Sequence, residues 1–181
     1  MASCLIVSLI GAPKCGKTTF IKDVCHYLKE KRDFEICMID ADDYLRTYTH
    51  VRSILGQYQQ RCDGKKIVLI LDKNMHEVNE RHIFYTLCKS YNASFGEVFF
   101  EIAEKTCQER NQADIHSGNV TLADFKSMFN KSRLPTIFQP WENKYIAVEL
   151  PNNGSNVVWM VIELYRTLSF MEDNLALVNT I

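Results

Sequence analysis

The sequence has neither an excess of one charge nor a long apolar run. Its formal net charge is −1 over 181 residues, so no overall positive field draws it to nucleic acid. No apolar run approaches the length of a membrane-spanning helix. The early apolar segment 4–10 lacks the basic flank of a secretory signal, so we expect neither a signal peptide nor membrane association. The hydrophobic content of 46% is enough for one domain with a real core.

Cysteine pairs of the C-x-x-C type are absent as well. The seven cysteines are Cys4, Cys15, Cys25, Cys37, Cys62, Cys88 and Cys107. Their odd number, and the apolar runs in which several of them lie, are typical of reduced thiols in a cytoplasmic protein. The five histidines have no metal-ligand spacing with these cysteines, so we predict no structural zinc site.

The sequence does contain a phosphate-binding loop. The pattern G-x-x-x-x-G-K-[ST] is matched without a gap by Gly11, Ala12, Pro13, Lys14, Cys15, Gly16, Lys17 and Thr18, and Thr19 follows. The apolar segment 4–10 precedes the loop, and a helical pattern over 19–31 follows it. A plain turn with a solvent-exposed lysine is the alternative, and the strand–loop–helix context weighs against it.

The chemistry of such a loop is the binding of phosphates. Its backbone N–H groups and the N-terminus of the following helix bind the α- and β-phosphates of a nucleotide. Lys17 would reach the β- and γ-phosphates, and the Thr18 hydroxyl would bind Mg²⁺. We therefore predict that the protein binds ATP or GTP together with Mg²⁺.

Apolar strand-like segments alternate with helical patterns along the chain, which is typical of βαβ units. The expected strands are 4–10, 35–39, 67–71, 97–102 and 145–150, and the expected helices are 19–31, 43–62, 77–91, 104–110, 121–131 and 156–170. We predict an α/β fold with a five-stranded parallel sheet between helices, the three-layer sandwich of P-loop kinases. The domain would cover residues 1–170, with a lid near 111–121 and an irregular tail at 171–181.

Aspartates gather after the second expected strand, at the end of the sheet where ligands of open α/β folds bind. Asp40, Asp42 and Asp43 stand within one short segment, and crowding of like charge suits a site beside Mg²⁺ or a cationic substrate. We expect one of Asp42 and Asp43 to be the catalytic base that accepts the proton of a substrate hydroxyl. The other would cap the next helix, and the spacing does not separate the two roles.

Three further residues mark the expected site or its surroundings. Asp72 follows the third strand, at the Walker-B position that holds Mg²⁺. Arg110 precedes the lid and would stabilise charge on the transferring phosphoryl group, although a surface arginine is the alternative. Trp141 lies in the proline-containing segment 135–142, and we expect it to anchor that segment rather than to stack on a base.

In their order along the chain, these motifs resemble the L-seryl-tRNA(Sec) kinase family. The strand-end motif 72–74, with Arg81 seven residues after Asn74, is similar to the D-D/T-N and Y-x-S-M-R motifs of that family, although S-M is absent. Residues 106–111 are similar to its T-C-x-x-R-N motif, and residues 128–142 to its W-E motif. The Elongator-associated P-loop family shares much of this pattern.

The resemblance implies an ATP-dependent kinase that transfers the γ-phosphoryl group to a hydroxyl, with the serine of seryl-tRNA(Sec) as one acceptor. ATP and Mg²⁺ would be its cofactors, and tRNA or another RNA its partner. Lys17, Asp42 or Asp43, and Arg110 would carry the catalysis, while Thr18 and Asp72 would bind the metal.

Two departures from that family keep other functions open. Asp114 stands where the family has a second lid arginine, which reverses the charge at a place expected to face phosphate. We also expect residues 151–181 to be too few for the helical domain with which the family grips tRNA. The alternatives are a nucleotide-gated ATPase or switch that binds tRNA or a protein, and an RNA 5′-hydroxyl kinase.

Overall fold

The computed structural model describes residues 4–30, 34–40, 43–61, 64–113, 120–131, 141 and 145–149. The strands are β1 (Cys4–Ile10), β2 (Phe34–Asp40), β3 (Lys66–Asn74), β4 (Ser94–Glu101) and β5 (Tyr145–Glu149). The helices are α1 (Lys17–Lys29), α2 (Tyr44–Gln59), α3 (Val78–Ser90), α4 (Glu104–Ala113) and α5 (Leu122–Lys131). These elements confirm the predicted alternation, whereas the helix expected at 156–170 and the tail at 171–181 lie outside the described residues.

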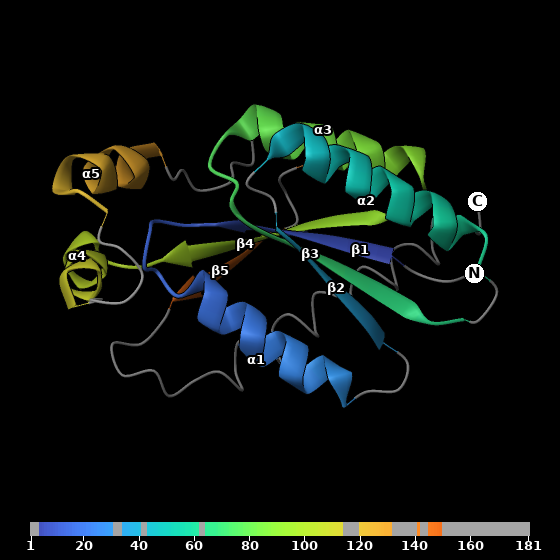
Figure 1. Cartoon of the computed structure of the whole chain (residues 1–181), viewed down its shortest axis with the longest axis horizontal. Helices are drawn as coiled ribbons and strands as arrows, with labels where there is room; N and C mark the ends of the chain where they lie inside the picture. The colour runs from blue at the N-terminus through green and yellow to red at the C-terminus, as the bar shows by residue number, and fades with distance from the viewer. Residues whose placement is uncertain are drawn as a thin grey trace.

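The strands form one parallel sheet (Figure 1). The strands β2, β3, β1 and β4 lie in that order, and β5 pairs with the outer edge of β4. The chain therefore crosses over β3 when it passes from β1 through α1 to β2. Because β1 lies between two parallel strands, the loop that follows it begins in the middle of the sheet, at its carboxyl edge.

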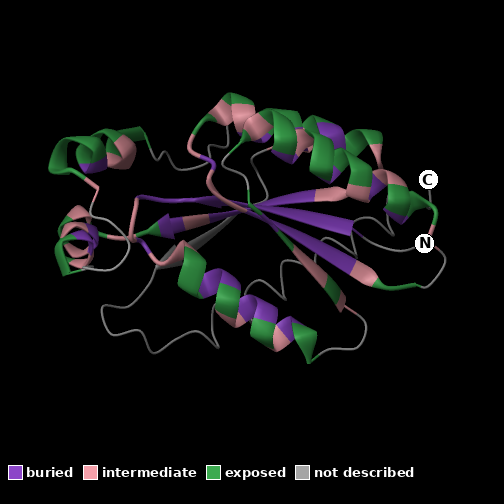
Figure 2. Ribbon diagram, viewed as in Figure 1, coloured by how far each residue is buried: buried purple, intermediate pink, exposed green. Residues whose placement is uncertain are grey.

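Helices cover both faces of this sheet, as predicted for a three-layer arrangement. Helix α1 packs on one face, and α2 and α3 pack on the other (Figure 1). Alternate residues of β1 divide between two cores: Leu5 and Val7 face α1, whereas Cys4 and Ile6 face α2 and α3. A strand buried on both sides is largely apolar, which is why segment 4–10 has only Ser8 as a polar residue and shows no polar–apolar alternation. Figure 2 shows β1, β3 and β4 largely buried, the edge strand β2 mostly intermediate or exposed, and the outer sides of the helices exposed.

A bulge in β3 shapes the carboxyl edge of the sheet. Ser8 pairs with Leu71, but its neighbour Leu9 pairs with Asn74, so the two residues between have no partner on β1. One of them, Asp72, remains paired with Asp40 of β2. The other, Lys73, forms an ion pair with Glu80 of α3 at 3.1 Å. The bulge thus brings Asn74, the last residue of β3, opposite Leu9 of β1 and beside the start of the phosphate loop.

Trp141 packs against the rest of the fold. Its ring centroid lies 5.2 Å from that of His82, 5.6 Å from that of Tyr85 and 6.5 Å from that of Phe95. These contacts with α3 and β4 support the anchoring role expected for Trp141. In the described part of the chain, no helix is both long and apolar enough to span a bilayer.

Candidate nucleotide site

The phosphate loop has the backbone conformation that its glycines make possible. Gly16 immediately precedes α1 with φ 104° and ψ 10°, a left-handed conformation that a side chain would strain. Lys14 also has a positive φ, of 61°. The loop connects the end of β1 to the start of α1. The first N–H groups of α1 therefore lie at the carboxyl edge of the sheet. Such a helix N-terminus is favourable for phosphate.

The ammonium group of Lys17 is held by the loop. Its Nζ atom donates hydrogen bonds to the carbonyl oxygens of Gly11 and Ala12, each at 2.8 Å, and lies 3.5 Å from Cys15 Sγ. The Lys17 ammonium group therefore lies within the loop and joins two of its carbonyl oxygens. Thr18 and Thr19 are exposed in the first turn of α1, so their hydroxyls are accessible to a ligand.

The start of the loop is fixed by contacts that the sequence analysis did not foresee. The Gly11 N–H donates to Asn74 Oδ1 at 3.0 Å, and the Met75 N–H donates to the Leu9 carbonyl at 2.9 Å. A Cβ added to Gly11 would lie 2.7 Å from Cys15 Sγ and 2.9 Å from Phe100 Cβ, closer than such atoms pack. The only sequence signal for Asn74 was its place in the strand-end motif, which carries no information about its partner.

A buried arginine holds the segment that follows Asn74. Arg81 of α3 donates from Nη1 to the carbonyl oxygens of Met75 at 2.8 Å and His76 at 3.1 Å. Its guanidinium also forms an ion pair with Glu97 of β4. The sequence analysis noted the spacing of Arg81 but assigned it no role.

The predicted carboxylates lie at the ends of neighbouring strands. Asp40 and Asp72 are directly paired in the register of β2 and β3, so their backbones lie about 4.8 Å apart. Asp43 caps α2, since its Oδ1 accepts a hydrogen bond from the Arg46 N–H at 2.9 Å. This is the capping role expected of either Asp42 or Asp43. Asp42 lies outside the described residues.

Helix α4 brings Arg110 to the loop. Arg110 Nη1 donates to the Lys14 carbonyl oxygen at 3.4 Å, across 96 residues of sequence. The next residue, Asn111, bonds both backbone groups of Val120: its Nδ2 donates to the carbonyl at 2.8 Å, and its Oδ1 accepts from the N–H at 3.3 Å. Asn111 thereby joins the two ends of the expected lid, whose middle, including Asp114, lies outside the described residues.

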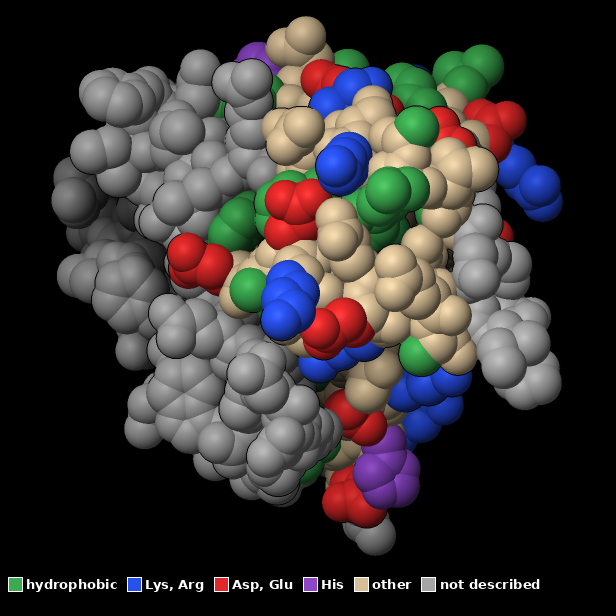
Figure 3. Space-filling model, turned by 90° about the vertical axis from the view of Figure 1, so that its left-hand side faces the viewer, with side chains coloured by type: hydrophobic (Ala, Val, Ile, Leu, Met, Phe, Trp, Pro, Cys, Tyr) green, Lys and Arg blue, Asp and Glu red, His purple; other side chains and the backbone are tan. Residues whose placement is uncertain are grey.

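The site carries positive charge next to buried thiols. Burial, together with the neighbouring Cys15, raises the pKa of Cys107 to about 11, although Arg110 and Lys17 oppose this shift. Two cations therefore lie close enough to Cys107 to affect its proton. Toward the end of the molecule that holds α4 and α5, described acidic and basic side chains are interspersed, without a continuous patch of either sign (Figure 3).

The donor set fits magnesium rather than a metal held by protein alone. Within the described ranges, no group of three or more His, Cys, Asp or Glu side chains could hold a metal ion. Mg²⁺ in phosphate-transfer sites needs only one or two carboxylates beside a hydroxyl and the phosphates of the substrate. Thr18, exposed in the first turn of α1, and Asp72, half-buried at the end of β3, are donors of that kind.

Comparison with solved structures identifies the type of fold. The chain matches Kti12 of Chaetomium thermophilum in complex with ADP-AlF3 with a TM-score of 0.65 and 14% identity, over 90% of this chain and 98% of that one. It matches the APS kinase CysC of Mycobacterium tuberculosis, in complex with AMPPNP and APS, with a TM-score of 0.62 and 16% identity, over 93% and 99%. The chain has a P-loop kinase-like fold.

Sequence comparison does not assign the chain to a family within this fold. No family model matches the chain, and no curated protein sequence matches it. The likeness to Kti12 and to APS kinase therefore concerns the arrangement of the elements. The resemblance to the L-seryl-tRNA(Sec) kinase family stays a prediction from the motifs.

Proposed function

We propose that the protein is an ATP-dependent phosphotransferase that moves the γ-phosphoryl group to a hydroxyl acceptor. The observation that carries this proposal is the loop itself: Gly16 starts α1 in a left-handed conformation, and the Lys17 ammonium lies within the loop. The adenine nucleotides bound to Kti12 and to APS kinase support ATP as the donor. The acidic ends of β2 and β3 beside the loop favour transfer over mere nucleotide storage.

Each residue of the site has a separate role in this proposal. The loop N–H groups and Lys17 would bind the phosphates, whose oxygens can replace the carbonyls of Gly11 and Ala12 as acceptors for the ammonium. Thr18 and Asp72 would hold Mg²⁺, which supplies neutralisation of the phosphate charge when bound. We assign the base to Asp42, because Asp43 is engaged in capping α2. Arg110, already at the loop, would stabilise the charge on the γ-phosphoryl group.

The test is phosphoryl transfer from labelled ATP and Mg²⁺ to a panel of acceptors. The panel contains seryl-tRNA(Sec), free nucleosides, and RNA with a 5′-hydroxyl. We expect label on one acceptor, lost in Lys17→Ala and retained in Lys22→Ala, which removes an exposed lysine from the same helix. If ATP binds but no acceptor in the panel is labelled, the transfer proposal is wrong.

The rival function is a nucleotide-gated switch that binds a partner without phosphorylating it. Asp114 in place of a lid arginine favours this function, since a carboxylate there would repel the negative charge of the phosphoryl group during transfer. The likeness to Kti12 is compatible with either function. Partner capture that needs ATP, is lost in Lys17→Ala and persists in Asp42→Asn would support the switch over the kinase.

A further inference from the structure

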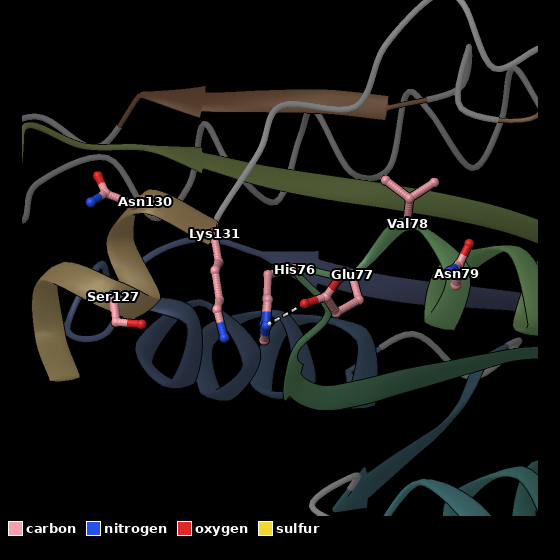
Figure 4. Close-up of a pocket in the computed structure, with 7 residues that line it drawn as sticks. All are labelled: His76, Glu77, Val78, Asn79, Ser127, Asn130 and Lys131. Atoms are coloured by element: carbon pink, nitrogen blue, oxygen red, sulfur yellow. Dashed lines mark ion pairs between the residues drawn. The ribbon is translucent and has the colours of Figure 1, made fainter.

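A polar pocket opens between α3 and α5. It has a volume of about 550 Å³, within the range of small-molecule sites. Its lining is His76, Glu77, Val78, Asn79, Ser127, Asn130 and Lys131. Figure 4 shows the Lys131 side chain of α5 extending beside His76, which comes from the segment between β3 and α3.

Both walls of this pocket are attached to the phosphate loop. The first wall follows Asn74, which accepts the hydrogen bond from Gly11 at the start of the loop. His76 is two residues beyond Asn74, so their Cα atoms lie within about 7.6 Å. The second wall is α5, which is joined to α4 through the Asn111–Val120 hydrogen bonds. Because α4 contacts the Lys14 carbonyl through Arg110, the pocket lies between two elements that hold the same loop.

Most of the described lining residues carry polar or charged groups, and several of these groups have unused hydrogen-bonding capacity. With the other residues that the structure describes, the side chains of Asn79, Asn130 and Lys131 make no hydrogen bond or ion pair. His76 is oriented by its own contacts: its Nδ1 lies 3.1 Å from the Asn74 carbonyl, and its Nε2 lies 3.4 Å from Glu77 Oε1. A carbonyl oxygen only accepts, so Nδ1 carries a hydrogen. Among the lining residues that the structure describes, Val78 is the one aliphatic side chain.

These groups point to the class of the acceptor. Side-chain amides donate and accept, which suits the hydroxyl groups of a sugar and the edge of a base. A lysine at the rim suits a phosphate monoester or diester. The volume admits one nucleotide unit and not a folded protein segment.

We propose that this pocket receives the acceptor as a nucleoside monophosphate unit, either free or at the end of an RNA. The proposal rests on the phosphotransferase function proposed above and names its second substrate. An acceptor hydroxyl oxygen forms the new bond to the γ-phosphorus while the bond from that phosphorus to the β–γ bridging oxygen breaks. The electron pair leaves with ADP, and the hydroxyl proton passes to the carboxylate base.

The experiment measures acceptor binding while AMPPNP and Mg²⁺ saturate the donor site. AMP, GMP, CMP and UMP are titrated by calorimetry into the full chain, followed by trinucleotide RNAs with and without a 5′-phosphate. The variants are Lys131→Glu on α5 and Asn79→Ala on α3. The matched control is Lys126→Glu, an exposed lysine of α5 that does not line the pocket.

We expect at least one mononucleotide or trinucleotide to bind, and Lys131→Glu to weaken its binding by about tenfold or more. Asn79→Ala should weaken binding less, and Lys126→Glu should leave it unchanged. Preference for free nucleotides or for RNA ends identifies the source of the unit. Absence of binding by every probe, or equal affinities in Lys131→Glu and Lys126→Glu, would overturn the proposal.

The AMPPNP titration separates this inference from the proposed function. If AMPPNP binds to the chain and the acceptor probes do not, the pocket assignment fails while the nucleotide site stands. If AMPPNP does not bind, the donor site itself is wrong. All variants change exposed residues, and circular dichroism verifies that each one is folded.

Discussion

Arg81 and Glu97 form an ion pair in the interior of the protein. Arg81 Nε lies 2.8 Å from Glu97 Oε1, and the two side chains are 0% and 1% exposed. The same guanidinium holds the carbonyls of Met75 and His76, which follow the residue that binds Gly11. The pair therefore joins α3 and β4 to the segment that supports the phosphate loop.

Removing one member of this pair should be costly because the other charge stays buried. We expect Arg81→Met to lower the free energy of unfolding by about 3–5 kcal/mol. The double variant Arg81→Met/Glu97→Met should recover part of that loss, since no charge then remains buried. Urea unfolding of the three proteins measures both effects.

A surface pair of the same length is the control for this prediction. Arg61 Nη2 lies 2.8 Å from Glu35 Oε2, but the side chains are 32% and 46% exposed. We expect Arg61→Met to change the free energy of unfolding by about 1 kcal/mol or less. Equal losses in Arg61→Met and Arg81→Met would show that burial of the Arg81–Glu97 pair is not what makes it costly to break.

Gly11→Ala should damage the nucleotide site directly. The new Cβ would lie 2.7 Å from Cys15 Sγ and 2.9 Å from Phe100 Cβ, so the loop must move away from β4. We expect a loss of about 1–3 kcal/mol in the free energy of unfolding and a weaker affinity for a fluorescent ATP analogue. Titration of that analogue and urea unfolding measure the two effects.

Gly56→Ala is the matched control, because an added Cβ makes no close contact at this position. Gly56 lies within α2, and the nearest atom to an added Cβ is Tyr91 Cε1 at 3.9 Å. Alanine should stabilise the helix by about 0.5–1 kcal/mol and leave nucleotide affinity unchanged. Unchanged analogue binding in Gly11→Ala would mean that the tight packing around Gly11 does not shape the site.

The capping of α2 by Asp43 allows the two acidic roles to be separated. Asp43→Ala should lower the free energy of unfolding by about 1 kcal/mol, and Asp43→Ser should restore it, because a serine oxygen also accepts from the Arg46 N–H. With Asp42 as base, Asp42→Asn should slow phosphoryl transfer by about 10²–10⁴-fold, and Asp43→Ser should not. The reverse pattern in single-turnover transfer would assign the base to Asp43.

Local patterns predicted most of the fold. The apolar segments formed strands, and the three central ones, β1, β3 and β4, are largely apolar because both of their faces are covered. The helix expected at 121–131 is observed as α5, and Thr121 caps its start, where the Asp124 N–H donates to Thr121 Oγ1 at 3.2 Å. Helix α4 runs on to Ala113, three residues beyond the predicted end, and the side chain of Asn111 in its last turn bonds to Val120.

The contacts that shape the site could not be predicted in this way. The hydrogen bond from Gly11 to Asn74 spans 63 residues, and the bulge that makes it possible depends on the pairing between β1 and β3. Glu97 lies in an apolar segment and showed no sign of its partner on α3. Each of these contacts is set by how strands and helices are arranged in space, which local spacing does not record.

The buried thiols predict a loss of stability at alkaline pH. Burial raises the pKa of Cys4 from 9.0 to about 12, and that of Cys107 from 9.0 to about 11. In the unfolded chain each thiol ionises near its ordinary pKa, so the stabilising effect is complete below pH 9.0 and is lost as pH rises from there to the folded pKa. Within that window each thiol should lower the free energy of unfolding by about 1.4 kcal/mol per pH unit.

Cys107→Ala should remove the contribution of Cys107 to this slope. Val98→Ala, which truncates a buried side chain that does not ionise, should keep the slope and lower only the absolute stability. Urea unfolding between pH 9.0 and about 11 measures the slopes, and equal slopes in Cys107→Ala and Val98→Ala would contradict a protonated thiol at Cys107.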